Sequence, residues 1–391
     1  MTDGQSDTPN NMPFIPVCEP IIGEQEKEYV ADALASGWVS SAGKYVDAFE
    51  EQWASYCQRS FGITVSSGTA ALEVAVRACQ IGPGDEVIIP NFTIISCALS
   101  VIHAGATPVF VDVDPDTWTL VPEAVEAAIT PRTKAVMVVH MYSQPAHMQA
   151  LLDIAKKHEL MVIEDAAQAH GAQCLISDDT GSIAEWRRCG SFGAVSCFSF
   201  YGNKILTTGE GGMILTNDPD IAERARSFRN LCFTPERRFL HKESGFNYRL
   251  TNIQAAIGLG QLERIEHILD EKRRIGHAYT KRLSELKGIR LQTLTDWAKP
   301  VYWMFGLVLT DECNKDATEV MAFLKKHLID SRPFFVGMHQ QPVFKDNRSG
   351  QQGHFPVSDT LAERGLYLPS GLKTTTDMIE RICATLEEAI R

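Results

Sequence analysis

One lysine of this chain lies between an aromatic segment and a cluster of glycines. The stretch FSFYGNKILTTGEGG spans residues 198–212 and carries Lys204 near its centre. A lysine placed just after a buried strand is desolvated, so its amine loses a proton more easily and becomes a nucleophile that can form a Schiff base. For any single lysine, a solvated position on a loop is the commoner arrangement. The sequence around Lys204 alone therefore does not decide between a reactive lysine and a solvated one.

Two other groups suit the same chemistry. Residues 66–69 (SSGT) precede a helical pattern, where free amide groups and the helix dipole attract a phosphate, although the same residues also make an ordinary helix cap. Glu164 and Asp165 end an apolar run, and a buried carboxylate there needs a cationic partner such as a protonated ring nitrogen, unless it caps the next turn. A phosphate-type turn, a buried acid and a lysine are together three groups that pyridoxal phosphate requires.

The segments that hold these residues alternate between strand-like and helical patterns. Apolar runs separated by helices predict an α/β unit with a mainly parallel sheet covered on both faces, and ligands bind at the carboxyl ends of such strands. We expect strands at 86–90, 108–113, 135–140, 160–167, 194–200 and 212–217, and helices at 69–80, 94–103, 122–129 and 146–158. All three candidate groups fall at strand ends of this one unit.

A second unit is expected after the sheet. Residues 252–286 form a long helical pattern with little turn chemistry, and a strand at 301–309 and helices at 317–328 and 374–390 follow it. A chain of 391 residues also exceeds the size at which one core keeps growing. We therefore expect a loose tail at 1–12, a large cofactor-binding domain at 13–260, and a smaller α+β domain with its connecting helix at 261–391.

Composition disfavours several classes of partner. Forty-nine acidic against 37 basic residues give a net charge of −12, which disfavours binding along nucleic acid. The ten cysteines show no CxxC pair and no metal-type clustering, so we expect reduced thiols and no metal site. The polar N-terminus is unlike a signal peptide, and no apolar run approaches the ~18 residues of a membrane span. We expect a cytoplasmic protein with neither membrane nor nucleic acid as partner.

Four longer motifs resemble a known family. The order SSGTAAL, VIEDAAQAHGA, SFYGNKILTTGEGGM and GFNYRLTNIQAAIGLGQLE is similar to that of the DegT/DnrJ/EryC1/StrS sugar aminotransferases, and the likeness runs from about Ile15 to the C-terminus. It implies fold type I of the pyridoxal phosphate-dependent aminotransferases, L-glutamate as amino donor, and a homodimer with shared active sites. Within the family, WVSSAGKYVDAFE, VYWMF and DSRPFF look most like GDP-perosamine synthases, which aminate carbon 4 of a nucleotide-linked 4-keto-6-deoxy sugar.

The resemblance also implies cofactor contacts residue by residue. Lys204 would bind pyridoxal phosphate covalently and later move a proton between cofactor and substrate carbon. Asp165 would pair with the pyridine nitrogen, and Gln168 would contact the ring or its 3-hydroxyl. Further cofactor contacts are implied for Ser67, Gly68, Thr69, Ile94, Ser199 and, reaching across the dimer, Asn247.

The implied substrate contacts are spread more widely. Trp38 and Ser40, with Ser41 beside them, match a segment near the sugar. Arg332 and His339 match positions that border the substrate, and Arg249 would meet the charge of the nucleotide across the dimer. Arginine suits a diphosphate because its fork makes paired, charged hydrogen bonds. For each arginine, a structural salt bridge is the alternative.

Two positions depart from the family pattern. Ile94 stands where an aromatic residue usually stacks on the pyridine ring, so Phe92 or another ring would have to take over that contact. Gln168, followed by His170, stands where perosamine synthases usually carry an acid. These departures leave a UDP- or dTDP-linked keto sugar and a cyclitol ketone as alternative substrates. Lys204 argues against a sugar dehydratase, where histidine replaces it, and with Asp165 against a non-catalytic sensor.

Overall fold

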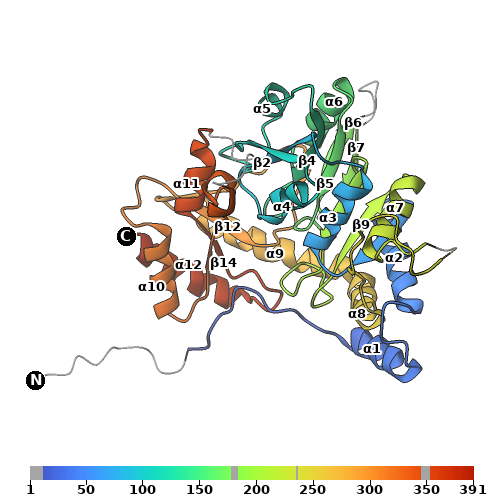
Figure 1. Cartoon of the computed structure of the whole chain (residues 1–391). Coiled ribbons are helices and arrows are strands. Elements are labelled where there is room, and N and C mark those ends of the chain that lie inside the picture. The colour runs from blue at the N-terminus through green and yellow to red at the C-terminus, as the bar shows by residue number, and fades with distance from the viewer. Residues whose placement is uncertain (1–11, 178–183, 235–236, 345–352) are drawn as a thin grey trace, which may run out of the picture.

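The protein consists of a larger unit built on a wide sheet and a smaller unit beside it, with helix α9 (Ile265–Leu283) running between them (Figure 1). This computed structural model describes residues 12–177, 184–234, 237–344 and 353–391. The loose tail expected at 1–12 lies, apart from Met12, outside the described residues.

Seven strands form the central sheet of the larger unit, in the order β1-β9-β8-β5-β4-β2-β3. All run parallel except β9, which is antiparallel to both of its neighbours. The strands are β1 (Phe61–Val65), β2 (Glu86–Pro90), β3 (Thr107–Val111), β4 (Thr133–Val139), β5 (Met161–Asp165), β8 (Val195–Ser199) and β9 (Gly212–Thr216). The six predicted strands are confirmed to within two residues at each end, and β1 is an addition to them.

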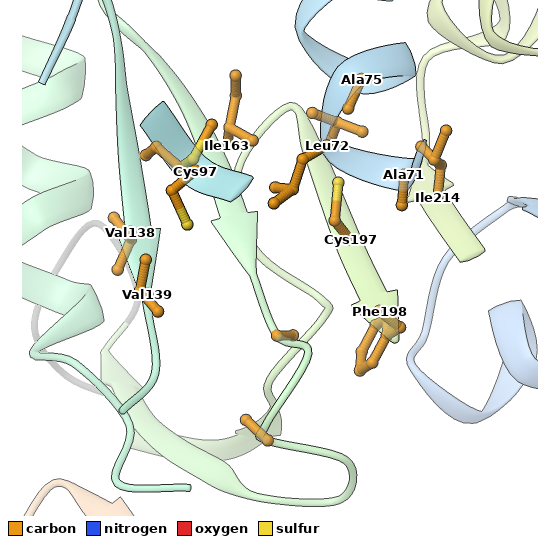
Figure 2. Close-up of a cluster of buried hydrophobic side chains, with 14 of the residues drawn as sticks. Ala71, Leu72, Ala75, Cys97, Val138, Val139, Ile163, Cys197, Phe198 and Ile214 are labelled. Carbon is orange, nitrogen blue, oxygen red and sulfur yellow. The ribbon is translucent and has the colours of Figure 1, made fainter. Parts of the chain in front are cut away.

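Helices cover both faces of this sheet. On one face, Leu72 of α3 (Gly68–Ala78) lies against Cys197 of β8 (Figure 2). The next residue of the strand, Phe198, points to the other face and meets the ring of Trp53 in α2 (Lys44–Tyr56) edge-on, with ring centres 5.0 Å apart. Successive strand residues alternate between faces, so an apolar residue at every position is what burial on both sides demands. The other helices of this unit are α1 (Glu24–Ser36), α4 (Ser96–His103), α5 (Pro122–Ala127), α6 (Met148–Lys157), α7 (Pro219–Arg229) and α8 (Asn252–Glu263).

The smaller unit has its own four-stranded antiparallel sheet, ordered β10-β12-β14-β13. Its buried side chains, among them Leu307, Leu366 and Ile382, form a cluster separate from the main core. Near the N-terminus, Ile15 pairs with Ile329 of this unit and joins its cluster. Its elements are β10 (Ile289–Leu291), β12 (Phe305–Leu309), β13 (Arg332–Pro333), β14 (Gly365–Leu368), α10 (Ala317–Lys326), α11 (Pro356–Arg364) and α12 (Thr376–Ile390). The domain boundary at 260/261 stays a prediction.

Two differences from the predicted elements have physical causes. The long helix expected at 252–286 is two helices, α8 and α9, because Arg264 leaves the helical conformation and its Nε donates to Glu26 Oε1 at 2.9 Å. A third, small sheet of β6 (Gln173–Ser177), β7 (Ala184–Arg188) and β11 (Ala298–Lys299) was not predicted. Within the described residues, no helix combines the length and apolar character needed to cross a membrane.

Candidate active site

A cavity of about 310 Å³ lies where β5 and β8 end and α3 begins. Parallel strands present their carboxyl ends at one edge, and ligands of α/β proteins collect there. The predicted cofactor contacts that line this cavity are Ser67, Gly68, Thr69, Ile94, Asp165, Gln168, Ser199 and Lys204. The fold thus brings together residues that are far apart in the sequence.

Lys204 is half-buried in the loop that follows β8. Its backbone N–H donates to the carbonyl of Tyr201 at 2.8 Å, and its Nζ lies 3.8 Å from the ring centre of Trp303. Burial lowers the pKa of Lys204 to about 8, and the charge of Asp165 opposes part of that shift. An amine with this pKa is partly unprotonated near neutral pH, as a nucleophile must be.

Asp165 is only 3% exposed at the end of β5. One carboxylate oxygen accepts the N–H of Ala167 at 3.0 Å, and the other accepts the thiol of Cys97 at 3.2 Å. Burial raises the pKa of Asp165, while these donors and the charge of Lys204 lower it. No cationic side chain of the described residues pairs with it, so this buried carboxylate is short of a positive partner.

The neighbouring acid, Glu164, faces a different environment. Its carboxylate accepts the ring N–H of His140 at 2.9 Å and the backbone N–H groups of Gly190 and Phe192 at 2.5 and 3.0 Å. The other ring nitrogen of His140 accepts a backbone N–H, so neither nitrogen is free to bind a metal, although Cys189 also lies close by. Glu164 therefore organises the chain around residues 190–192, and Asp165 alone faces the cavity.

The first turn of α3 lines the cavity with groups that suit an anion. The Ser67 hydroxyl caps this turn, and the backbone N–H groups of Gly68 and Thr69 make no hydrogen bond within the described part of the chain. A Cβ at residue 68 would lie 2.7 Å from Cβ of Ser199, so only glycine lets the helix start this close to β8. The Thr69 hydroxyl bonds to that of Ser96 at 2.8 Å. Free N–H groups and hydroxyls at a helix start make an anion site.

Gln168 contributes one free donor. Its Oε1 accepts the backbone N–H of Tyr142 at 2.7 Å, which fixes the orientation of the amide. Its Nε2 makes no hydrogen bond to any of the residues that the structure describes. A ring hydroxyl is an acceptor that this group would satisfy.

Ile94 lines the cavity and is 38% exposed, but Phe92 does not reach it. The ring of Phe92 is fully buried against Phe334 and Phe335, with ring centres 5.8 and 6.3 Å away. The suggestion that Phe92 replaces the missing aromatic at position 94 is therefore wrong. The aromatic residues that do line the cavity are Tyr201, Trp303, Phe335 and Tyr367.

The predicted substrate contacts lie outside this cavity in the single chain. Trp38, 60% exposed, and Ser40 belong to the loop between α1 and α2, which Asn252 holds through their carbonyl oxygens. Arg249 donates to Oδ1 of Asn230 at 2.8 Å and lines a separate cavity of about 490 Å³. Four arginines line that second cavity, namely Arg226, Arg229, Arg238 and Arg249.

The remaining predicted contacts are engaged elsewhere or exposed. Arg332 pairs with Asp330 at 3.1 Å. The two ring nitrogens of His339 are held by Asn91 and Asp359, at 2.9 and 3.1 Å. Asn247 is exposed and belongs to neither cavity lining. The substrate roles of these residues stay predictions.

The sequence did not predict the side of the cavity that residues of the smaller unit line. Trp303, Phe335 and Tyr367 line the cavity from segments that follow the central sheet in the chain. Trp303 lies in VYWMF, which was predicted to begin the strand at 301–309, but β12 begins only at Phe305 and leaves Trp303 in the segment before it; the aromatic cluster was the available signal. Nothing in the pattern around Tyr367 distinguishes it from an ordinary strand residue.

The residues present fit pyridoxal phosphate. The group needs an amine, an acid for its ring nitrogen, a donor for its ring hydroxyl and an anion site for its phosphate. Lys204, the unpaired Asp165, Nε2 of Gln168 and the free N–H groups of α3 offer these four around one cavity.

Comparisons with known proteins agree with this geometry. Residues 20–387 match the DegT/DnrJ/EryC1/StrS aminotransferase family. The GDP-perosamine synthase of Caulobacter vibrioides is 39% identical over 382 residues, which cover 97% of this chain and 100% of that protein. A putative pyridoxal phosphate-dependent aminotransferase of Bacillus subtilis, EpsN, is 32% identical, covering 94% of this chain and 93% of its own. The crystal structure of DesV from S. venezuelae superimposes with a TM-score of 0.86 at 33% identity, over 97% of this chain and 100% of that chain.

Proposed function

Because the chain belongs to the DegT/DnrJ/EryC1/StrS aminotransferase family, we propose that it transfers the amino group of L-glutamate to carbon 4 of a nucleotide-linked 4-keto-6-deoxy sugar. The substrate we propose is GDP-4-keto-6-deoxymannose, and the product is GDP-perosamine. One observation carries the proposal: the chain is similar over 97% of its length to a GDP-perosamine synthase and groups Lys204, Asp165 and the first turn of α3 around one cavity.

The enzyme uses pyridoxal phosphate as its cofactor. When bound, the cofactor supplies an electron sink and carries the amino group from donor to acceptor. Asp165 would accept a hydrogen bond from the ring nitrogen and hold the proton there, because no cationic side chain of the described residues forms an ion pair with its buried carboxylate. The Gln168 amide would donate to the ring hydroxyl.

Lys204 moves the protons. Its amine removes a proton from the α-carbon of glutamate in the first half-reaction and delivers one to carbon 4 of the sugar in the second. A pKa of about 8 suits both tasks, because a group that must accept and release a proton near neutral pH works best when its pKa is close to that pH.

The phosphate end of the cavity anchors the cofactor. The N–H groups of Gly68 and Thr69 and the hydroxyls of Ser67 and Ser199 would hold the phosphate, with the helix dipole adding to their attraction. Ile94, an aliphatic residue of the same lining, would offer the ring no aromatic stacking.

We also propose a cytoplasmic homodimer with shared active sites. Asn247 and Arg249 lie outside the cavity of their own chain, which supports their reaching the site of a second subunit. Trp38, Ser40, Arg332 and His339 are proposed to contact the sugar nucleotide in that assembly. Mixing an inactive Lys204→Ala chain with an inactive Asn247→Ala chain should restore part of the activity if sites are shared. Independent sites would give no recovery.

The substrate is tested with a panel of ketones. The holoenzyme is first treated with L-glutamate, which bleaches the visible band of the bound cofactor. It is then offered GDP-, UDP- and dTDP-linked 4-keto-6-deoxy sugars and cyclitol ketones one at a time. Recovery of the band with the GDP sugar, and the mass of an amino sugar nucleotide as product, are expected. Recovery only with a UDP or dTDP sugar, or only with a cyclitol, would assign the alternative substrate.

A further inference from the structure

Trp303 covers the reactive lysine from the smaller unit. The centre of its ring lies 3.8 Å from Nζ of Lys204. Its indole N–H donates to the carbonyl of Asn203, the residue before Lys204, at 2.7 Å. The indole is thereby tied to the backbone beside the lysine whose amine it faces. Such a contact between a protonated amine and an aromatic face is attractive.

The backbone of Trp303 is held from two further directions. Its N–H donates to the hydroxyl of Ser143 at 2.8 Å, and its carbonyl accepts the ammonium group of Lys272 at 2.7 Å. The same ammonium group also donates to the carbonyl of Ser370. Ser370 follows β14, so Lys272 ties together two segments of the smaller unit.

Lys272, on α9, is an unusual residue to hold the Trp303 backbone, because lysine is rarely buried. It is only 3% exposed and has no ion pair among the described residues. Burial lowers its pKa to about 8. A buried charge without an opposite partner weakens a fold, and a well-packed apolar side chain would often serve stability as well or better. Stability alone therefore does not explain a lysine at position 272. Its hydrogen bond to the carbonyl of Trp303 gives it a second role, which is to hold that residue in place.

We propose that Trp303, through the packing of its ring on the Lys204 side chain and its hydrogen bond to Asn203, keeps the Lys204 nitrogen where it exchanges protons with substrate, and that Lys272 is the positioning residue that keeps Trp303 there. This rests on the proposed function, in which Lys204 carries protons. In the first half-reaction the C–H bond at the α-carbon of glutamate breaks, its electron pair passes to the electron sink that the bound cofactor would supply, and the proton passes to Nζ of Lys204. An amine held in one place transfers protons faster than one that samples several positions.

The test compares two variants on the same helix. Lys272→Met removes the ammonium group, whereas Tyr279→Phe removes a buried hydroxyl that donates to the carbonyl of Pro369 at 2.8 Å. Lys272→Met loses a contact to Ser370 and Tyr279→Phe loses one to the adjacent Pro369, but only Lys272→Met also loses a contact to Trp303. The single-turnover rate with L-glutamate is measured in the holoenzyme, together with the isotope effect for glutamate deuterated at the α-carbon.

Lys272→Met should slow this half-reaction about tenfold or more and raise the isotope effect, because proton transfer becomes slower relative to binding. Near-ultraviolet circular dichroism of the cofactor-free protein should also lose intensity in the tryptophan region. Tyr279→Phe should leave rate, isotope effect and spectrum within twofold of the wild type.

A second pair of variants keeps the proposal testable if Lys272→Met does not fold. Trp303→Leu should reproduce the slow rate and larger isotope effect, and Trp303→Phe, which retains an aromatic face, should recover part of the rate. Folded Lys272→Met and Trp303→Leu proteins with wild-type rate and isotope effect would overturn the positioning role while leaving the proposed function intact. A wild type that does not react with glutamate would overturn both.

Discussion

Lys204 should capture pyridoxal phosphate with a pH dependence centred near 8. A lysine with the ordinary pKa of 10.5 has about one amine in a thousand unprotonated at pH 7.5, whereas a pKa of about 8 leaves about one in four. The reactive fraction is therefore a few hundred times larger than for an exposed lysine. The assay follows the visible band as cofactor is added to cofactor-free protein between pH 6 and 11.

The Asp165→Asn variant tests the cause of this pKa, because it removes the charge that lies near Lys204. Its carboxylate is the charge that favours the protonated form of Lys204, so its removal should move the midpoint below 8, by about one pH unit. Glu210→Gln is the matched control, because Glu210 lines the same cavity but does not contribute to the pKa of Lys204. A wild-type midpoint near pH 10 would contradict the lowered pKa of Lys204, and a midpoint that rises in Asp165→Asn would contradict the effect of the Asp165 charge on it.

Four further outcomes are expected. Gly68→Ala should lower the free energy of unfolding by about 1–3 kcal/mol in urea titrations, because its Cβ would lie 2.7 Å from Cβ of Ser199; an unchanged midpoint would contradict the tight start of α3. Glu164→Gln should cost about 1–3 kcal/mol by the same measurement, yet leave the capture midpoint of Lys204 near 8. Lys272 has a pKa of about 8 when folded against 10.5 ordinarily, so the unfolded chain binds more protons between these pH values and wild-type stability rises with pH; Lys272→Met should remove up to about 1.4 kcal/mol per pH unit of that rise, and an unchanged slope would contradict the lowered pKa of Lys272. Ile94→Phe should bind the cofactor several-fold more tightly in equilibrium titrations, since a stacked ring adds about 0.5–1.5 kcal/mol; an unchanged affinity would contradict a contact between position 94 and the cofactor ring.

The strands of the central sheet could be predicted because both of their faces are buried. Runs such as EVIIP are apolar at every position, and the structure places β2 at the predicted residues. The short strands β6, β7 and β11 could not be predicted, because AEWRR of β7 is polar and partly exposed, QCLIS of β6 has only three apolar residues and β11 only two residues in all, and the three strands are defined by pairing with one another. The break between α8 and α9 depends on the contact of Arg264 with Glu26, a residue from the other end of the chain.

Some residues of the candidate site could likewise be predicted from local sequence patterns, and others could not. Lys204, Asp165 and the turn at Ser67 each follow or precede a predictable element, so the sheet itself brings them to one edge. Trp303 comes from the smaller unit, whose packing against the sheet no local pattern encodes.

Lys204 is the residue that we propose binds the cofactor covalently. Holoenzyme reduced with borohydride fixes any bond between a lysine and pyridoxal phosphate, and peptide mass spectrometry then locates the modified residue. We expect one phosphopyridoxyl group per chain, on Lys204, and none in the Lys204→Ala variant. Modification of another lysine in the wild type, or a wild type that carries no group after incubation with the cofactor, would contradict it.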